Sequence, residues 1–291
     1  MIRAFQKEYL ANRYKVLNLI GKGTTSYIYK AYDTKIKKLV AIKCLPEFNY
    51  QDVLILKREF RNISDWSHNN LVEFYDLYIQ EQIIFFTMEW INGFSYYHSI
   101  WGRDFFCNKS ADYNFLREIF IQLTKGIQFL HSLGILHRDI KPDNIMVDSK
   151  RAILIDFGLS RNFFKYIPEW DNLAEIDGTF AYMPPEVLKG KAPSTASDWY
   201  SLGVVLYESL TGKLPDVILG FDPTPPISLV PDIPEDLNEI TLQLLYRDEN
   251  KRPSGHEIVK KLKSSFSFLD FAASDYPTNS IYSKKNRDFF F

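Results

Sequence analysis

The chain has 291 residues, and its 35 Lys and Arg residues nearly balance 36 Asp and Glu residues, which argues against a nucleic-acid partner. Its two cysteines provide neither a disulfide framework nor the spacing of a metal site. No apolar run approaches the roughly 20 residues of a membrane span, so we expect a soluble, cytoplasmic protein with no membrane span.

The first third of the chain is rich in β-branched and aromatic residues that alternate with polar ones, which predicts a five-stranded antiparallel sheet. The expected strands are Tyr14–Ile20, Tyr27–Tyr32, Leu39–Lys43, Leu71–Tyr78 and Ile83–Met88. Between the third and fourth strands, the spacing of Leu56, Phe60 and Ile63 predicts one helix with an inward apolar stripe.

The rest of the chain is mainly helical in pattern. A long core helix is expected from Asp112 to Gly134, because apolar residues recur there every three or four positions. A second helix is expected to open at Ser197-Asp198 and to stop at Gly212, and its apolar character on all sides predicts burial. Prolines between Pro215 and Pro234 indicate a loop before helical residues resume at 237–242. The fold class is therefore α+β.

One short stretch carries most of the chemistry. Residues 137–144 read His-Arg-Asp-Ile-Lys-Pro-Asp-Asn, and Asp156 follows at the end of an apolar strand. Phosphoryl transfer requires such a set, because the protein contributes mainly by positioning and by neutralising charge on oxygens. Asp139 would accept the proton of the acceptor hydroxyl, Lys141 would contact the transferred phosphate, and Asn144 and Asp156 would hold magnesium.

With this stretch at its centre, the chain resembles the eukaryotic-type serine/threonine protein kinase family from about Tyr14 to about Leu262, through six motifs in the family's order. The resemblance implies a bilobal protein kinase fold. A small sheet lobe with one main helix would span residues 14–88, a hinge 89–93, and a larger, mainly helical lobe 94–262. It also implies ATP and Mg²⁺ as cofactors and a Ser/Thr hydroxyl of a protein as the acceptor.

The resemblance assigns the nucleotide site residue by residue. A phosphate-covering loop is matched by Gly21, Lys22, Gly23, Thr24, Thr25 and Ser26, where Ser26 replaces the family's third glycine. The purine would lie between Ile28, Ala41 and Met146. Backbone groups of Glu89 and Ile91 would pair with the adenine edge, and Met88 would gate the pocket behind it.

Further roles follow from the same resemblance. Lys43 would grip the α- and β-phosphates and pair with Glu59 of the predicted helix, with Glu47 as the alternative partner. Thr179 would hydrogen-bond to Asp139 and Lys141. It lies in residues 177–186, a run that resembles the platform on which a protein kinase receives its peptide substrate.

Three other acidic residues receive expectations. Asp198 is expected to hold the backbone of the catalytic loop, and Glu186 to pair with Arg252 in the interior. Glu175 occupies the position at which related kinases carry an activating phosphate that pairs with Arg138. Two interpretations of Glu175 remain open: it mimics that phosphate in part, or it belongs to a solvated acidic loop.

Residues 264–291 fall outside the resemblance and are strongly aromatic. We interpret this tail either as a strip packed on the kinase domain or as a linker to a missing region, through which a regulatory partner or further domain would act. The alternative function is a pseudokinase, a nucleotide-binding or scaffolding module, and only Ser26 favours it. A small-molecule kinase is disfavoured by the platform at residues 178–186.

Overall fold

The structure is a computed structural model, and its described part contains two compact units. Among the described residues, 8–67 and 72–92 belong to the first unit, and 68–71 and 93–264 belong to the second. The described ranges are 8–22, 26–45, 50–80, 83–100, 113–148, 151–157, 178–216 and 222–264. The first unit holds a sheet and one helix and the second is mainly helical, as the α+β prediction requires.

The sheet of the first unit contains all five predicted strands and one more. In the order β1-β2-β3-β4-β6-β5, every neighbouring pair is antiparallel. The strands are β1 (Tyr9–Leu10), β2 (Tyr14–Lys22), β3 (Tyr27–Asp33), β4 (Lys38–Leu45), β5 (Phe74–Gln80) and β6 (Ile83–Glu89). The prediction of five strands is thus corrected to six, because a two-residue strand is too short to show an alternating pattern.

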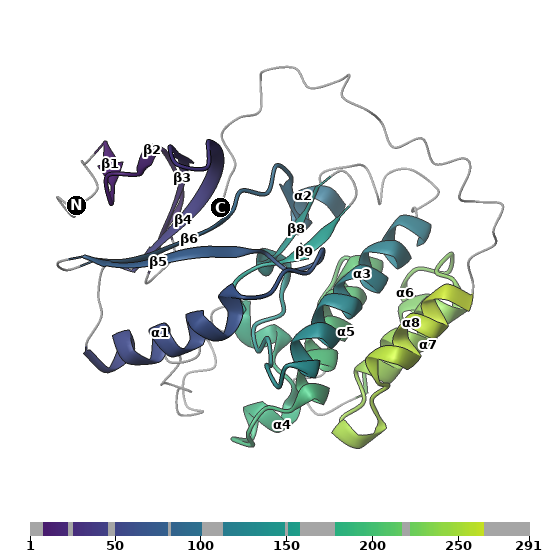
Figure 1. Ribbon diagram of the computed structural model, residues 1–291. Coiled ribbons are helices and arrows are strands. Elements are labelled where there is room, and N and C mark those ends of the chain that lie inside the picture. Colours follow the sequence, from purple (N-terminus) through teal and green to yellow (C-terminus); the bar gives the residue numbers. More distant parts are fainter. Residues whose placement is uncertain are drawn as a thin grey trace, which may run out of the picture. The chain divides into compact units, whose positions relative to one another are not determined.

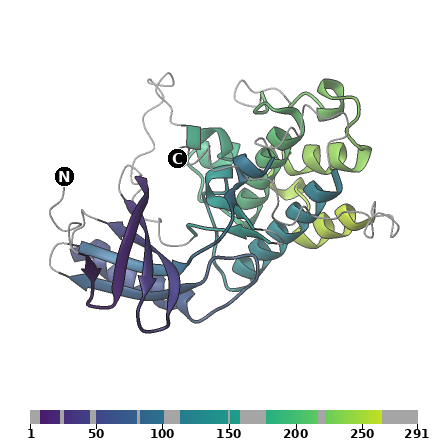
Figure 2. The same ribbon diagram turned by 90° about the horizontal axis from the view of Figure 1, so that it is seen from above.

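A buried ion pair ties the first residues of the sheet to its far edge. Arg13 donates two hydrogen bonds to Asp33, of 2.9 and 2.6 Å, and lies 3.0 Å from Asp76. Tyr14 donates a hydrogen bond of 2.8 Å to the same Asp76. These contacts draw β2 toward β5 and accompany the pronounced curl of the sheet (Figure 2). Burial alone would raise the pKa of Asp33, but the bonds from Arg13 and from backbone amides hold that pKa below its usual value.

The inner side of the curled sheet is an aromatic core. Tyr14 and Phe85 are almost completely buried, and their rings meet edge to face at 6.3 Å. Tyr78 stacks on Phe85 at 4.9 Å, and Leu10 of β1 packs into the same cluster. The short strand β1 therefore contributes an apolar anchor, which explains why the sheet extends beyond its five predicted members.

Helix α1 (Tyr50–Ser64), the one helix in the described part of the first unit, runs along the sheet beside β5 (Figure 1). The predicted stripe of Leu56, Phe60 and Ile63 is buried, and Val53 joins it. The ring of Phe60 lies 6.1 Å from that of Phe74 and 6.4 Å from that of Phe86. The helical periodicity in the sequence therefore identified the packed face correctly.

The fourth predicted strand began too early. Strand β5 starts at Phe74, whereas Leu71 forms a parallel bridge with Leu154 in the second unit. The cause is Asn70, whose side chain donates to the carbonyl of Ala152 at 3.0 Å and to Gln122 at 2.9 Å. Residues 68–71 are therefore anchored to the helical unit, and the apolar Leu71 packs there.

The second unit consists mainly of helices, with a small antiparallel sheet of the order β7-β8-β9 at one side of them (Figure 1). Its elements are β7 (Phe94–Ser95), α2 (Tyr96–Ile100), α3 (Tyr113–Ser132), η2 (Pro142–Asn144), β8 (Ile145–Val147), β9 (Ala152–Leu154), η4 (Gly178–Tyr182), α4 (Pro185–Leu188), α5 (Thr195–Thr211), α6 (Pro226–Leu229), α7 (Glu235–Leu244), η5 (Glu249–Lys251) and α8 (Gly255–Ser264). The predicted proline-rich loop thus contains the short helix α6.

Among the helices of the described ranges, none combines the length and apolar character needed to cross a bilayer.

Helix α5 is the buried centre of this unit. It begins at Thr195, two residues before the predicted start, because Ser194 caps it and exchanges hydrogen bonds with Ser197 in a capping box. It ends as predicted at Gly212, whose φ of 72° is in the left-handed region. Every residue from Ser197 to Tyr207 is buried, which confirms the burial expected from the apolar sequence.

Candidate active site

The segment that carries the proposed catalytic residues is anchored to α5 by a single carboxylate. Asp198, which is 1% exposed, accepts hydrogen bonds from the backbone N–H groups of His137 at 2.9 Å and Arg138 at 2.8 Å. Its Oδ2 also lies 2.8 Å from Nε2 of His131 on α3. The expected role of Asp198 is therefore confirmed. His131 was not anticipated, because a histidine in the last turn of a core helix does not reveal its partner.

Three of the proposed catalytic side chains meet at Asp139. The Nδ2 atom of Asn144 donates to Oδ2 of Asp139 at 2.7 Å and to its carbonyl at 2.8 Å. The ammonium group of Lys141 lies 3.2 Å from the same Oδ2. The side chains of Asp139 and Lys141 are 18% and 16% exposed, so they are held in place but remain accessible to a substrate. The carboxylate is thus oriented from two sides.

The backbone beside Asp156 is joined to the same segment. Ile155 donates its N–H to the carbonyl of Asn144 at 2.9 Å, and its carbonyl lies 3.2 Å from Nε2 of the buried His137. Burial lowers the pKa of His137, so its imidazole stays neutral near pH 7. Asp156 itself has a φ of 61° and Arg138 a φ of 70°. Such left-handed conformations of residues other than glycine are costly, and surrounding contacts maintain them.

The donor atoms of Asn144 and Asp156 suit magnesium. Mg²⁺ prefers oxygen ligands and is usually held by one or two carboxylates together with substrate phosphates. The amide nitrogen of Asn144 is already bonded to Asp139, so the amide oxygen is the atom that a metal ion could use. Within the described ranges, no group of three His, Cys, Asp or Glu residues forms a metal site. That finding is compatible with a site of one carboxylate and one amide.

In the first unit, four of the proposed nucleotide residues share one face of the sheet. Lys43 is paired with Ile28 of β3 and with Phe86 of β6, and Ala41 is paired with Met88. Directly paired residues, and residues two apart on one strand, point to the same side of a sheet. Ile28, Ala41, Lys43 and Met88 therefore face the same side, although they come from three strands.

At the end of β6 and directly after it, existing contacts limit which backbone groups could bind a nucleotide. The N–H of Glu89 donates to the carbonyl of Glu73 at 2.8 Å, so a nucleotide contact from Glu89 would use its carbonyl oxygen. Ile91 is 7% exposed, and Trp90 lies between them with the ammonium of Lys30 4.4 Å from its ring centroid. In the second unit, Met146 is half-buried in β8, paired with Ser95 and Ile153.

Several proposed residues lie partly or wholly outside the described residues. Gly21 and Lys22 end β2 and Ser26 precedes β3, but Gly23, Thr24 and Thr25 between them are outside the described ranges. The same holds for Glu47, Glu175 and the tail after Ser264. Glu59 lies in α1 and Thr179 in η4, but their side chains are outside the described part, so the Lys43 pairing stays a prediction.

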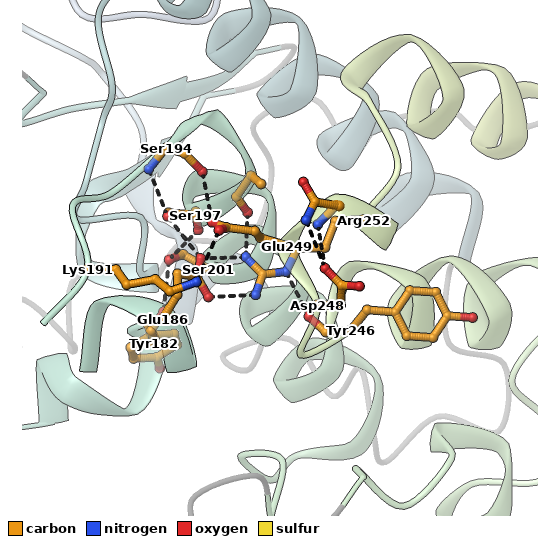
Figure 3. Close-up of polar contacts among 12 residues, drawn as sticks. Tyr182, Glu186, Lys191, Ser194, Ser197, Ser201, Tyr246, Asp248, Glu249 and Arg252 are labelled. Atoms are coloured by element: carbon orange, nitrogen blue, oxygen red, sulfur yellow. Dashed lines mark hydrogen bonds and ion pairs between the residues drawn. The ribbon is translucent and has the colours of Figure 1, made fainter. Parts of the chain in front are cut away.

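The run that resembles a substrate platform is fixed by a buried ion pair (Figure 3). Both carboxylate oxygens of Glu186 accept hydrogen bonds of 2.7 Å from Arg252, which confirms the predicted pair. Arg252 also donates to the carbonyls of Ala196 at 2.9 Å and Tyr246 at 2.8 Å. Burial alone would raise the pKa of Glu186, but the bonds from Arg252 and Ser197 hold that pKa below its usual value.

Comparison with known proteins places these motifs in context. Residues 14–262 match the model of the protein kinase domain. A probable serine/threonine-protein kinase of Clostridium acetobutylicum is 32% identical over 275 residues, covering 88% of this chain and 40% of that protein. A probable serine/threonine-protein kinase of Clostridium perfringens is 30% identical over 272 residues, covering 87% of this chain and 38% of that protein. The chain thus spans about two fifths of the length of these two relatives.

A solved structure shows the same fold. The PknI kinase domain of Mycobacterium tuberculosis matches with a TM-score of 0.68 and 20% sequence identity. The match covers 86% of this chain and 94% of the PknI chain. At this level of identity the likeness concerns the fold alone, and it agrees with the predicted α+β kinase fold.

The buried pair of Glu186 and Arg252 gives a pH-dependent prediction. Glu186→Gln leaves the Arg252 cation buried without its counter-ion, so we expect a loss of about 3–5 kcal/mol in the free energy of unfolding near neutral pH. The folded-state pKa of Glu186 lies below its ordinary value of 4.5. The stability that the ionised carboxylate contributes is therefore present at pH values above 4.5 and is lost as the pH falls through the folded-state pKa. Denaturant titrations of both proteins at several pH values measure the difference, and a difference that does not narrow below 4.5 would contradict the assignment.

Proposed function

The chain belongs to the protein kinase family, and from this premise we propose that it is an ATP-dependent serine/threonine protein kinase. It transfers the γ-phosphoryl group of Mg-ATP to a hydroxyl group of a protein. The observation that carries the proposal is the convergence of Asn144 and Lys141 on the carboxylate of Asp139, in a segment that Asp198 anchors to α5.

The arrangement supports a separate role in phosphate transfer for each of these residues. Asp139 accepts the proton of the attacking hydroxyl, a bond forms from that oxygen to the γ-phosphorus, and the bond from phosphorus to the departing ADP oxygen breaks. Asn144 orients Asp139 through its two hydrogen bonds, and the ammonium of Lys141 is close enough to contact the transferred group. Magnesium held by Asn144 and Asp156 would neutralise charge on the phosphate oxygens.

Residues 178–186 support a protein as the acceptor of the phosphate. Residues 178–186 follow the order of the family's peptide platform, and the Glu186–Arg252 pair fixes their end. Lys141 together with Thr179 is the combination typical of serine/threonine specificity. A small-molecule kinase would not need this platform. The alternative of a pseudokinase rests on Ser26 alone, which precedes β3 and is 9% exposed.

A labelling assay tests the proposed function. The purified chain is incubated with labelled ATP, magnesium and a mixture of protein acceptors, beside Asp139→Ala. We expect label in protein for the natural sequence and none for the variant. Replacing Lys43 with Met should slow transfer by roughly two to three orders of magnitude, because one preorganised electrostatic contact is lost. Nucleotide binding without any label would support the pseudokinase, and label found only in metabolites would support a small-molecule kinase.

Glu175 gives a separate prediction about regulation. We propose that its carboxylate partly replaces an activating phosphate opposite Arg138. The replacement is partial because a carboxylate carries about one negative charge, whereas a phosphate carries roughly 1.5 to 2. The enzyme would then be active as synthesised, and Glu175→Ala should lower the rate of the phosphatase-treated enzyme. Glu175→Asp, which keeps the charge, serves as the control. An unchanged rate for Glu175→Ala would leave Glu175 as part of a solvated acidic loop.

A further inference from the structure

Tyr182 is held at both of its polar ends. Its side chain is 7% exposed, and its hydroxyl donates a hydrogen bond of 2.7 Å to Oε2 of Glu208. The hydroxyl of Tyr97, on α2, lies 3.2 Å from the same hydroxyl and donates to Oε1 of Glu208 at 3.5 Å. At the backbone end, the carbonyl of Tyr182 accepts a hydrogen bond of 2.8 Å from Oγ of Ser201. Tyr182 is therefore fixed in both position and orientation.

Two of the residues that contact Tyr182, Ser201 and Glu208, belong to the largely buried helix α5. Ser201 and Glu208 are seven residues apart, about two turns of α5, so they lie on the same side of the helix. Ser197, one turn before Ser201, donates to Glu186 at 3.0 Å. Figure 3 shows Ser197 and Ser201 directed toward Glu186 and Tyr182. One side of α5 thus holds the segment from Tyr182 to Glu186 at three points.

Tyr182 and Ser201 are buried, whereas Tyr97 is 38% exposed, so burial strengthens the contacts of the first two residues. Burial raises the pKa of the Tyr182 hydroxyl and also that of Glu208, so the phenolic proton stays on Tyr182 and is available to Glu208. A hydrogen bond in such a setting is costly to leave unmade, since the remaining partner stays buried. Loss of the Ser201 hydroxyl should therefore loosen Tyr182, because water cannot easily replace it at this buried position.

We propose that Tyr97 and Ser201 are positioning residues, which hold Tyr182 and through it residues 180–186 in the conformation that receives the protein substrate. The inference rests on the proposed function, in which this segment is the peptide platform. Both residues lie in the helical unit, and their contacts are with Tyr182, Glu208 and the backbone of α5. Their removal should therefore affect the acceptor protein more than ATP.

The primary test measures two Michaelis constants in each of two variants. Tyr97→Phe and Ser201→Ala each remove one hydroxyl, and dephosphorylated casein serves as the acceptor. We expect the KM for casein to rise about two- to tenfold, the range set by one hydrogen bond, while the KM for ATP changes by less than about twofold. Ser201→Thr restores the hydroxyl and should return the KM for casein toward its original value.

Two matched controls separate positioning from loss of stability. Thr241→Val removes a buried helix hydroxyl that donates to the carbonyl of Leu237 on α7, away from the platform. Tyr246→Phe removes a hydroxyl from an exposed ring. Both controls should leave the KM for casein unchanged. If Thr241→Val raises that KM as much as Ser201→Ala does, with a similar drop in Tm, the effect is one of stability and the proposal fails.

Hydrogen exchange provides a readout that does not depend on catalysis. In the full chain, Tyr97→Phe and Ser201→Ala should speed exchange at the amides of residues 180–188, whereas Thr241→Val should not. If the natural sequence transfers no phosphate at all, the proposed kinase function fails, and exchange alone decides whether these residues hold the segment. Unchanged exchange at 180–188 in both variants would overturn the inference.

Discussion

The structure of the candidate site depends on the buried carboxylate of Asp198. A buried carboxylate is tolerated only when hydrogen-bond donors surround it, and here two backbone amides and an imidazole do so. The two amides belong to His137 and Arg138, directly before Asp139. Because Arg138 adopts a strained left-handed φ, this bonding keeps the segment in a conformation that it would not favour alone. The position of the proposed base is therefore set from α5.

Helix α5 supports both the segment that contains the proposed base and the segment that would bind the protein substrate. Through Asp198 it holds the segment that contains Asp139 and Asn144, and through Ser197 and Ser201 it holds the run that would receive a peptide. Thirteen of its 17 residues are buried, so close packing on most sides holds the helix in place within the helical unit. Proton acceptance and substrate placement would then share one support.

The sequence predicted most elements because strands and buried helices leave regular apolar patterns, as in α1 and α5. Family motifs supplied the Glu186–Arg252 pair and the role of Asp198. Features without a pattern were missed or misplaced: strand β1 has only two residues, and Asn70 draws Leu71 away from β5 through side-chain hydrogen bonds. Tyr97 and Ser201 contact the hydroxyl and the backbone carbonyl of Tyr182 from positions 85 and 19 residues away in the chain, which no local spacing reveals.

The most direct test of this account is amide exchange at residues 137–139 together with the rate of phosphate transfer, in Asp198→Asn. An asparagine offers one acceptor oxygen in place of two, so a buried donor loses its partner while the side-chain volume is kept. The account predicts faster exchange at these amides and a fall in kcat of about tenfold or more. Protected amides with an unchanged kcat would show that the catalytic segment does not depend on Asp198.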